Sequence, residues 1–235
     1  MKAILLAGGY GTRLKPITNK IPKCLVEINH KPLLLHWIEL LVNAGVHSIL
    51  INTHYLADQV ESFVSKSKYA DIITLSYEKE LLGTAGTVTN NLNFIDDDSI
   101  ILAHADNYTT CDLSEFIYAH LTKPQNTCMT MMLYNSERPK ESGIVEIDEN
   151  KIVVSFVEKS ESPSSNLANA AVYIIDTKVV ESINKYHLSD FSTEVIPMFM
   201  GQINTWYNDC FHIDIGTPSA LDLANKKAIE KNKII

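Results

Sequence analysis

The sequence predicts an α/β fold in which a mainly parallel sheet is covered by helices on both faces. Two observations lead to this prediction. Through the first half of the chain, short apolar runs alternate with longer segments of helical periodicity, which is the pattern of right-handed crossovers between parallel strands. Apolar residues also make up 46% of the 235 residues, which is enough for a substantial core. The second half differs, because several short strand-like segments there are separated only by polar turns.

The first half is expected to begin with a buried strand over residues 2–7, which a glycine-rich turn follows at once. A helix is expected over residues 33–44, because Leu34 and Leu41 share one face at helical spacing and Gly45 then favours a stop. The other expected elements of this half also alternate, with strands at 48–52, 73–77 and 99–104 and helices at 57–64, 86–92 and 112–121.

The second half is expected to complete the sheet with a mixture of strands and helices. Its strands are expected at 127–134, 143–147, 152–158, 168–175, 203–207 and 211–213, and its helices at 178–185, 193–200 and 218–231. The second and third strands form a hairpin, since Asn150 between them is a favoured turn residue. Ser192 or Thr193 is expected to cap the helix near 193–200. We treat residues 1–235 as a single domain.

Composition excludes several classes of partner. The net charge of −8 argues against nucleic acid and against an anionic membrane as the main partner. An anionic small substrate stays open, because a few local cations or a bound metal can reverse the sign of one cleft. No signal peptide and no apolar run near the ~18–20 residues of a membrane span is seen. The four cysteines are widely spaced without a Cys-x-x-Cys pair, so we expect a cytoplasmic protein with reduced thiols.

The strongest local signal is the glycine-rich segment LLAGGYGTRL at residues 5–14. Gly8, Gly9 and Gly11 follow the first strand, where backbone N–H groups can turn toward one point and cradle phosphate oxygens. Arg13 adds a fork of donors for the same anion. The segment lacks the Gly-Lys-Ser/Thr of a Walker A loop, and Leu14 stands where a dinucleotide fingerprint has its third glycine. A plain strand-to-helix turn is the alternative.

The resemblance to a known family becomes specific when neighbouring residues are added. GGYGTRL at residues 8–14, followed by Pro16, Ile17-Thr18 and Pro22-Lys23, resembles the signature of the sugar-1-phosphate nucleotidylyltransferases. Later family blocks appear in the right order over nearly the whole chain. The sequences of these blocks most resemble those of the mannose-1-phosphate and heptose-1-phosphate guanylyltransferases.

The resemblance implies a fold and a reaction. The fold would be a Rossmann-like three-layer sandwich with a mainly parallel mixed sheet, the GT-A-like nucleotidyltransferase fold. A sugar 1-phosphate would attack the α-phosphorus of a nucleoside triphosphate in line, giving a nucleotide sugar and pyrophosphate. Residues 1–110 would form the nucleotide-binding half and residues 111–235 the sugar-phosphate-binding half.

The resemblance also assigns residues to the nucleotide. Arg13 and Lys23 would be catalytic, because fixed cations stabilise the negative charge of the transition state. A carboxylate near the base suits guanine, which presents two adjacent donors, although a surface loop with an acidic cluster is the alternative reading of residues 78–86. The remaining nucleotide-binding residues implied are Ala7, Gly8, Gly9, Gly11, Thr12, Glu78, Glu80, Gly83 and Thr84.

Two aspartates are the implied magnesium ligands. Asp106 follows an expected strand at its carboxyl edge, where ligands bind in open parallel sheets, and Asp214 precedes Gly-Thr-Pro and the last helix. One aspartate from each half would complete an octahedral Mg²⁺ site together with phosphate oxygens. A helix cap is the alternative role for Asp214. His104-Ala105 replaces the family's usual Asn-Gly, a departure that bears on the sugar.

The sugar 1-phosphate would be held by residues of the second half. Gly143 would let the backbone contact the sugar ring. Glu158 would accept hydrogen bonds from the sugar hydroxyls, and Asn169 would make another hydroxyl contact. Lys159 would hold the phosphate, although Glu158-Lys159 could equally be an exposed ion pair at a strand end. Ala171 stands where the family usually has glycine, so a tighter pocket floor is expected.

The function predicted is transfer of a nucleoside monophosphate, with GTP as the preferred donor, to a sugar 1-phosphate of the mannose or heptose type. The same chemistry with dTTP, UTP or CTP is one alternative, and a phosphorylated acceptor other than a sugar is a second. A non-catalytic nucleotide-sensing subunit is a third, against which the full set of charged residues argues. The sequence leaves a monomer and a homo-oligomer both open, and it predicts neither nucleic acid nor membrane as a partner.

Overall fold

Four parallel strands form the first half of the central sheet. The structure is a computed structural model that describes residues 1–95 and 99–232. The four strands lie in the order β6-β1-β4-β5. Apolar side chains fill both faces of the inner strands, as expected of a sheet covered on both sides. Because the strands are parallel, their carboxyl ends gather at one edge, where the glycine-rich segment leaves β1. Their bounds are β1 Lys2–Leu6, β4 Ser48–Thr53, β5 Ile73–Tyr77 and β6 Ile100–His104.

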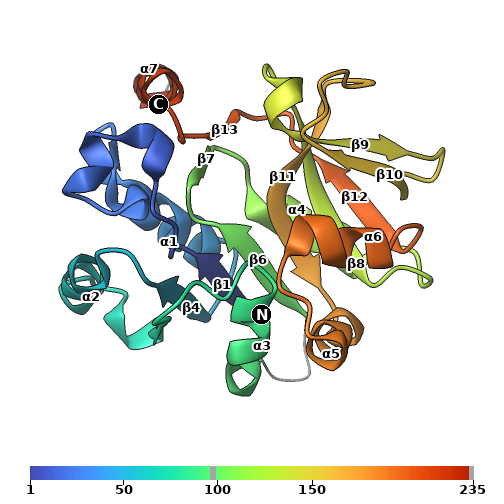
Figure 1. Cartoon of the computed structure of the whole chain (residues 1–235), viewed down its shortest axis with the longest axis horizontal. Helices are drawn as coiled ribbons and strands as arrows, with labels where there is room; N and C mark the ends of the chain where they lie inside the picture. The colour runs from blue at the N-terminus through green and yellow to red at the C-terminus, as the bar shows by residue number, and fades with distance from the viewer. Residues whose placement is uncertain (96–98, 233–235) are drawn as a thin grey trace.

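Strand β11 (Leu167–Ile175) runs in the opposite direction and joins the two halves of the chain. It pairs antiparallel with β6 on one side and with β8 (Met129–Asn135) on the other. β12 (Ile203–Tyr207) then lies parallel to β8. The predicted hairpin is present as β9 (Gly143–Ile147) and β10 (Val153–Glu158). Within the described residues these strands make one nine-stranded sheet that passes through both halves (Figure 1).

Helices cover both faces of this sheet and divide the core into two clusters. Side chains of α1, α2, α4 and α7 pack on one face, and those of α3, α5 and α6 pack on the other. This three-layer arrangement confirms the predicted fold class. None of the described helices combines the length and apolarity needed to cross a membrane. Their bounds are α1 Leu33–Asn43, α2 Ala57–Ser65, α3 Gly86–Asn90, α4 Leu113–Leu121, α5 Thr177–Tyr186, α6 Ile196–Met198 and α7 Pro218–Asn232.

A small two-stranded ribbon brings together two segments that lie about a hundred residues apart in the sequence. β7 (Asn107–Thr109), which the sequence did not predict, pairs antiparallel with β13 (His212–Asp214), so that Asp214 lies opposite Asn107. A second ribbon pairs Glu27–Ile28 (β2) with Lys31–Pro32 (β3). The first ribbon matters for the site, because it places Asp214 beside the residue that follows Asp106.

The helix expected near 193–200 has a different start. Phe191–Val195 forms a π-helical turn, which α6 then continues. Its cap is Asp190, whose side chain accepts from the Thr193 N–H at 2.8 Å, rather than Ser192 or Thr193. The Glu194 carboxylate in turn accepts from the backbone N–H groups of Ser189 and Asp190. The segment around Ser189 is thereby fixed, and it supports the loop after β5.

Candidate active site

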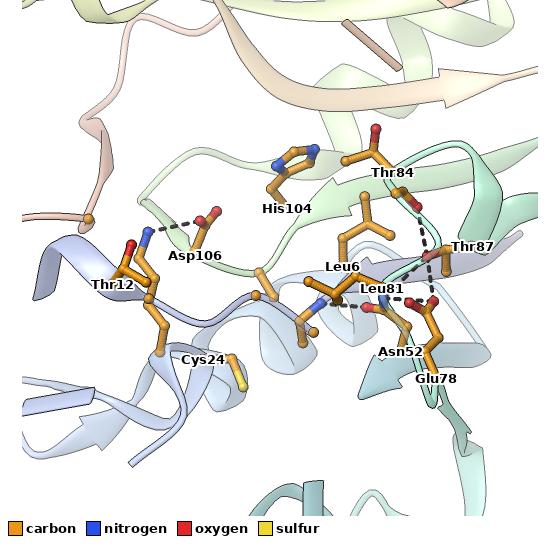
Figure 2. A pocket seen from close by; sticks show the side chains of 18 of the residues that line it. Leu6, Thr12, Cys24, Asn52, Glu78, Leu81, Thr84, Thr87, His104 and Asp106 are labelled. Carbon is orange, nitrogen blue, oxygen red and sulfur yellow. Dashed lines mark hydrogen bonds and ion pairs between the residues drawn. The ribbon is translucent and has the colours of Figure 1, made fainter. Parts of the chain in front are cut away.

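A cavity of about 350 Å³ opens at the carboxyl edge of the parallel strands (Figure 2). Its walls come from the glycine-rich segment, the ends of β4 and β6, and the loop that follows β5. All the predicted phosphate- and base-contacting residues line it except Glu80, which is exposed outside its lining. Arg13, Lys23 and Asp106 line it too, whereas Asp214 reaches it through its contacts with Lys23 and Arg13.

The glycine-rich segment folds tightly over Lys23 through Gly11. Gly11 has a φ of +61°, and a Cβ there would come within 2.9 Å of the Thr18 side chain and 3.2 Å of Lys23 Cβ. The Thr18 hydroxyl donates to the Gly11 carbonyl at 2.8 Å and holds the turn closed. Conformation and space therefore both require glycine here. Gly9 differs, since nothing lies within 4 Å of the position of its missing Cβ.

Four charged side chains meet at one end of the cavity. Lys23 Nζ lies 2.8 Å from Asp106 Oδ2 and 2.5 Å from Asp214 Oδ1. Arg13 Nη2 lies 3.0 Å from the other oxygen of Asp214. Gly216 permits this approach, because a Cβ there would come within 2.8 Å of Arg13 Nη2 and 3.0 Å of Asp214 Oδ2. The structure thus brings both predicted catalytic cations and both predicted metal ligands together.

The charges in this cluster shift the pKa values of Lys23 and Asp106 toward their charged forms. Burial by itself would lower the pKa of Lys23, but the charges of Asp106 and Asp214 outweigh it and raise that pKa above its ordinary value of 10.5. Burial would likewise raise the pKa of Asp106, but the neighbouring Lys23 ammonium lowers it below its ordinary value. The cluster has two cations and two carboxylates, so its net charge is zero. A bound triphosphate would add several negative charges beside it.

The donor set fits a divalent cation that is completed by substrate. Among the described residues, no cluster of three or more His, Cys, Asp or Glu side chains could hold a metal by itself. Asp106 and Asp214 nevertheless direct oxygens toward one point, where Lys23 Nζ lies. Mg²⁺ is usually bound by one or two carboxylates together with phosphate oxygens and water. These two carboxylates match that pattern, and a divalent cation there would take the position that Lys23 Nζ occupies.

Several residues assigned to the nucleotide have partners inside the protein. The Ala7 N–H donates to Asn52 Oδ1 at 2.6 Å. Glu78 is 3% exposed, and its carboxylate accepts from Asn52, from the Thr87 hydroxyl and from the Leu82 N–H. The Ala7 amide and the Glu78 carboxylate are thus both engaged within the protein, and Glu78 holds the loop that carries it.

Gly83 and Thr84 of the same loop pack against the segment before α6. Gly83 has a φ of +81°, and a Cβ there would come within 2.3 Å of the Ser189 carbonyl oxygen. The Thr84 hydroxyl accepts from the Phe191 N–H at 2.7 Å, and the Ala85 N–H donates to the Ser189 carbonyl. Packing within the protein is therefore sufficient reason for glycine at Gly83.

The predicted sugar-contacting residues lie apart from this cavity lining. Gly143 faces Glu158 across the β9–β10 hairpin, and a Cβ at Gly143 would come within 2.7 Å of that carboxylate. Lys159 Nζ lies 3.4 Å from the Glu158 carboxylate, so the ion pair that the sequence analysis gave as the alternative role of these two residues is present. Asn169 donates to the Tyr173 hydroxyl at 2.6 Å and accepts from the Ala171 N–H.

Ala171 has an unexpected backbone conformation. Its φ is +53°, within an irregularity of β11 between Asn169 and Tyr173. The left-handed region favours glycine, because a Cβ there is strained. The departure from the family glycine therefore places a Cβ at a backbone conformation that favours glycine.

Other residues of the site escaped the sequence analysis. Asn52 is the penultimate residue of β4, Thr87 is the second residue of α3, and Gly216 lies two residues after Asp214. Single Asn, Thr and Gly residues carry no motif, and their importance depends on side chains far away in the sequence. Only position could have suggested Asn52, since it lies near the carboxyl end of a parallel strand, at the ligand-binding edge.

Comparisons with known proteins agree with this geometry. A family model described as nucleotidyl transferase matches residues 2–231. The mannose-1-phosphate guanylyltransferase catalytic subunit beta of Drosophila melanogaster is 32% identical over 223 residues, covering 92% of this chain and 60% of that protein. The mannose-1-phosphate guanyltransferase of Saccharomyces cerevisiae is 31% identical over 229 residues, covering 93% and 62%. The chain thus spans about three fifths of the length of these curated relatives.

Solved structures resemble the chain over nearly its whole length. HddC from Yersinia pseudotuberculosis, solved in complex with GMP-PN, is 29% identical with a TM-score of 0.81, covering 97% of this chain and 99% of that one. A Bacillus anthracis protein described as a candidate glucose-1-phosphate thymidylyltransferase, solved with sucrose, gives a TM-score of 0.86. It covers 97% and 95% at 24% identity, and it supports the fold alone.

Proposed function

Because this chain belongs to the nucleotidyl transferase family, we propose that it transfers a nucleoside monophosphate from a nucleoside triphosphate to a sugar 1-phosphate. The observation that carries the proposal is the cluster of Arg13, Lys23, Asp106 and Asp214 beside a cavity walled by the glycine-rich segment. Fixed cations next to a phosphate cradle are what phosphoryl and nucleotidyl transfer require, because little covalent chemistry is left for the protein to do.

GTP is the nucleotide that we propose as the donor, and mannose 1-phosphate or a heptose 1-phosphate is the proposed acceptor. The relatives from Drosophila melanogaster and Saccharomyces cerevisiae carry names for guanylyl transfer to mannose 1-phosphate. HddC was solved with GMP-PN, a compound named for a guanine nucleotide. These names support guanine as the base and leave dTTP, UTP and CTP as the alternatives to test.

The proposed reaction uses the four charged side chains in distinct roles. The sugar phosphate, already ionised at neutral pH, attacks the α-phosphorus in line, and pyrophosphate leaves on the opposite side. Lys23 donates to oxygens of the reacting phosphate, and Arg13 holds the triphosphate, so that both neutralise charge that develops in the transition state. Asp106 and Asp214 would hold Mg²⁺, which supplies further positive charge to the phosphate oxygens when bound. No general base is needed.

A panel of substrates tests this proposal. GTP, ATP, UTP, CTP and dTTP are each combined with mannose 1-phosphate, a heptose 1-phosphate, glucose 1-phosphate and phosphocholine, and pyrophosphate release is measured in Mg²⁺. We expect release with GTP and a mannose or heptose 1-phosphate. Release with phosphocholine alone would move the acceptor to another class. Binding of nucleotide without pyrophosphate from any pair would contradict the proposal and favour a sensing role.

A further inference from the structure

The end of strand β4 touches both loops that line the nucleotide cavity. We call residues 7–13 the phosphate loop and residues 78–84 the base loop, after the roles proposed for them. Asn52 and His54 leave β4 on the same side, and each contacts both loops. No role for either residue follows from the reaction proposed above, although Asn52 lines the cavity.

Asn52 joins the two loops through the two ends of one amide (Figure 2). Its Oδ1 accepts from the Ala7 N–H at 2.6 Å, which fixes the orientation of the amide because a backbone N–H can only donate. Its Nδ2 therefore faces Glu78 Oε1 at 3.0 Å and Thr87 Oγ1 at 3.2 Å. All three side chains are at most 4% exposed. Asn52 thus holds a buried carboxylate of the base loop against the start of the phosphate loop.

Glu78 depends on this arrangement, since a buried carboxylate is costly unless donors surround it. Its Oε1 also accepts from the Thr87 hydroxyl at 2.6 Å, and its Oε2 accepts from the Leu82 N–H at 3.2 Å. The donors are neutral groups, so the charge is stabilised by hydrogen bonds. Loss of the Asn52 amide would leave Glu78 short of a donor and free the base loop to move.

His54 makes a second link between the same two loops. Its Nδ1 lies 2.9 Å from the Glu78 carbonyl oxygen, so Nδ1 carries a proton and donates. Its Nε2 then accepts from the Tyr10 hydroxyl at 2.8 Å when the ring is neutral. Tyr10 lies between two glycines of the phosphate loop. Asn52 holds the start of that loop and His54 holds its middle.

We propose that Asn52 and His54 are positioning residues, which set the separation of the phosphate loop from the base loop before the nucleotide binds. This inference rests on the proposed function of the cavity and deepens it. Binding then needs no ordering of either loop, and avoiding that cost strengthens affinity. Changes in the clasp, meaning Asn52, His54 and their loop partners, should therefore raise the KM for the nucleotide more than they lower kcat.

A reciprocal exchange of amide and carboxylate tests the first link. Asn52→Asp keeps an acceptor for the Ala7 N–H but sets two carboxylates against each other, so we expect the Kd for Mg²⁺–GTP to rise roughly 10- to 100-fold. In the double variant Asn52→Asp with Glu78→Gln, the new Gln amide can donate to the new Asp while its oxygen accepts from the Leu82 N–H. We expect the Kd to return to within about threefold of wild type.

The exchange separates positioning from direct reading of the base. If the double variant binds as weakly as Asn52→Asp, the charge of Glu78 itself serves the nucleotide and the proposal for Asn52 is wrong. Normal binding by Asn52→Asp alone would also overturn it. Asn184→Asp on the exposed face of α5 is the matched control.

Hydrogen exchange of the nucleotide-free protein gives a readout that does not depend on turnover. In Asn52→Asp we expect faster exchange at Leu82 and over residues 83–87, with the Ala7 amide still protected, whereas Asn52→Ala should expose both. For the second link, Tyr10→Phe should speed exchange at Leu14, whose N–H donates to the Gly11 carbonyl of the phosphate loop at 3.0 Å, with the exposed Tyr118→Phe as control. Unchanged exchange in these segments would overturn the clasp, whether or not the substrate panel supports nucleotidyl transfer.

Discussion

Lys23 shares the space between Asp106 and Asp214 in which those same oxygens would bind a divalent cation. The ammonium satisfies both carboxylates at once, so it competes with a metal as long as it stays there. We infer that Lys23 turns toward a phosphate when metal and nucleotide bind. The exchange would keep two carboxylates from facing each other unpaired at any stage, which is a costly arrangement in a partly buried site.

Lys23→Met should separate these two roles of the lysine. Without the ammonium, we expect Mn²⁺ to bind the nucleotide-free protein more tightly, by about tenfold or more, because its competitor is gone. Turnover should nevertheless fall about 10²- to 10³-fold, since a cation aimed at the transition state is lost. Metal affinity is measured by titration with Mn²⁺ and kcat by pyrophosphate release. Lys226→Met, at an exposed position of α7, is the control. Weaker Mn²⁺ binding by Lys23→Met would contradict the proposed competition between Lys23 and the metal.

Gly216→Ala tests how closely Arg13 must approach Asp214. The added Cβ would meet the Arg13 guanidinium at 2.8 Å, and a long flexible side chain can move away without unfolding the protein. We therefore expect a Tm within about 2 °C of wild type and a loss of about tenfold in kcat/KM. In an Arg13→Ala background the same change should have little further effect. A full tenfold loss there would mean that Gly216 acts through another contact.

At the scale of elements, a polar network joins α4 to the start of α5 at the end of the sheet away from the cavity. Asp176 accepts from His120 Nε2 at 2.9 Å and from the Ser99 hydroxyl at 2.8 Å, and it pairs with Lys123 at 3.0 Å. Burial by itself would raise the pKa of Asp176, but hydrogen bonds from His120, Lys123 and Ser99 outweigh it and lower that pKa to about 2.

Asp176→Asn should destabilise the protein in a pH-dependent way. The pKa of Asp176 is lower in the folded chain than its ordinary 3.8, so its contribution is present above about pH 4 and is lost as pH falls toward 2. We expect a loss of about 1 to 2 kcal/mol at pH 7, reduced from the full linkage value because the side chain is partly exposed. Urea unfolding at pH 7 and pH 3 measures it, with exposed Asp222→Asn as control. An equal loss at both pH values would mean that the charge is not responsible.

The elements predicted from sequence are those with a strong local signal. The buried strands β1, β4 and β6 and the amphipathic helix α1 appear within a residue or two of the expected bounds, because apolar periodicity marks them directly. β7 and the π-helical turn at Phe191–Val195 were not predicted. β7 exists only because β13, about a hundred residues later, pairs with it, and no local pattern reports such a partner.

The site shows the same division between local and distant causes. The charged residues Arg13, Lys23, Asp106 and Asp214 were found through a resemblance, and the family match confirms that resemblance. The polar partners that hold them or the loops in place were not found. Asn52 reaches Glu78 across 26 positions and Ala7 across 45, so its role depends on tertiary contacts that no single segment of sequence contains.

At the scale of the whole molecule, the two halves share a sheet and a site. β11 from the second half pairs with β6 from the first through four residue pairs, Val172 with Ala103 among them. Lys23 and Arg13 from the first half both bond to Asp214 from the second. Neither half has a complete sheet or a complete charged cluster without the other. We propose on this ground that residues 1–235 fold as a single cooperative domain.

Calorimetric unfolding tests that proposal. We expect one transition, with the calorimetric enthalpy equal to the van't Hoff enthalpy, because loss of the β6–β11 pairing would expose core from both halves at once. Mg²⁺–GTP at a hundred times its Kd should stabilise the folded chain by about 2.7 kcal/mol and shift the whole transition upward. Asp214→Asn should lose most of that shift while keeping one transition, since it removes a proposed metal ligand that comes from the other half. Two transitions, of which only the first moved with nucleotide, would instead mean that the nucleotide half unfolds independently.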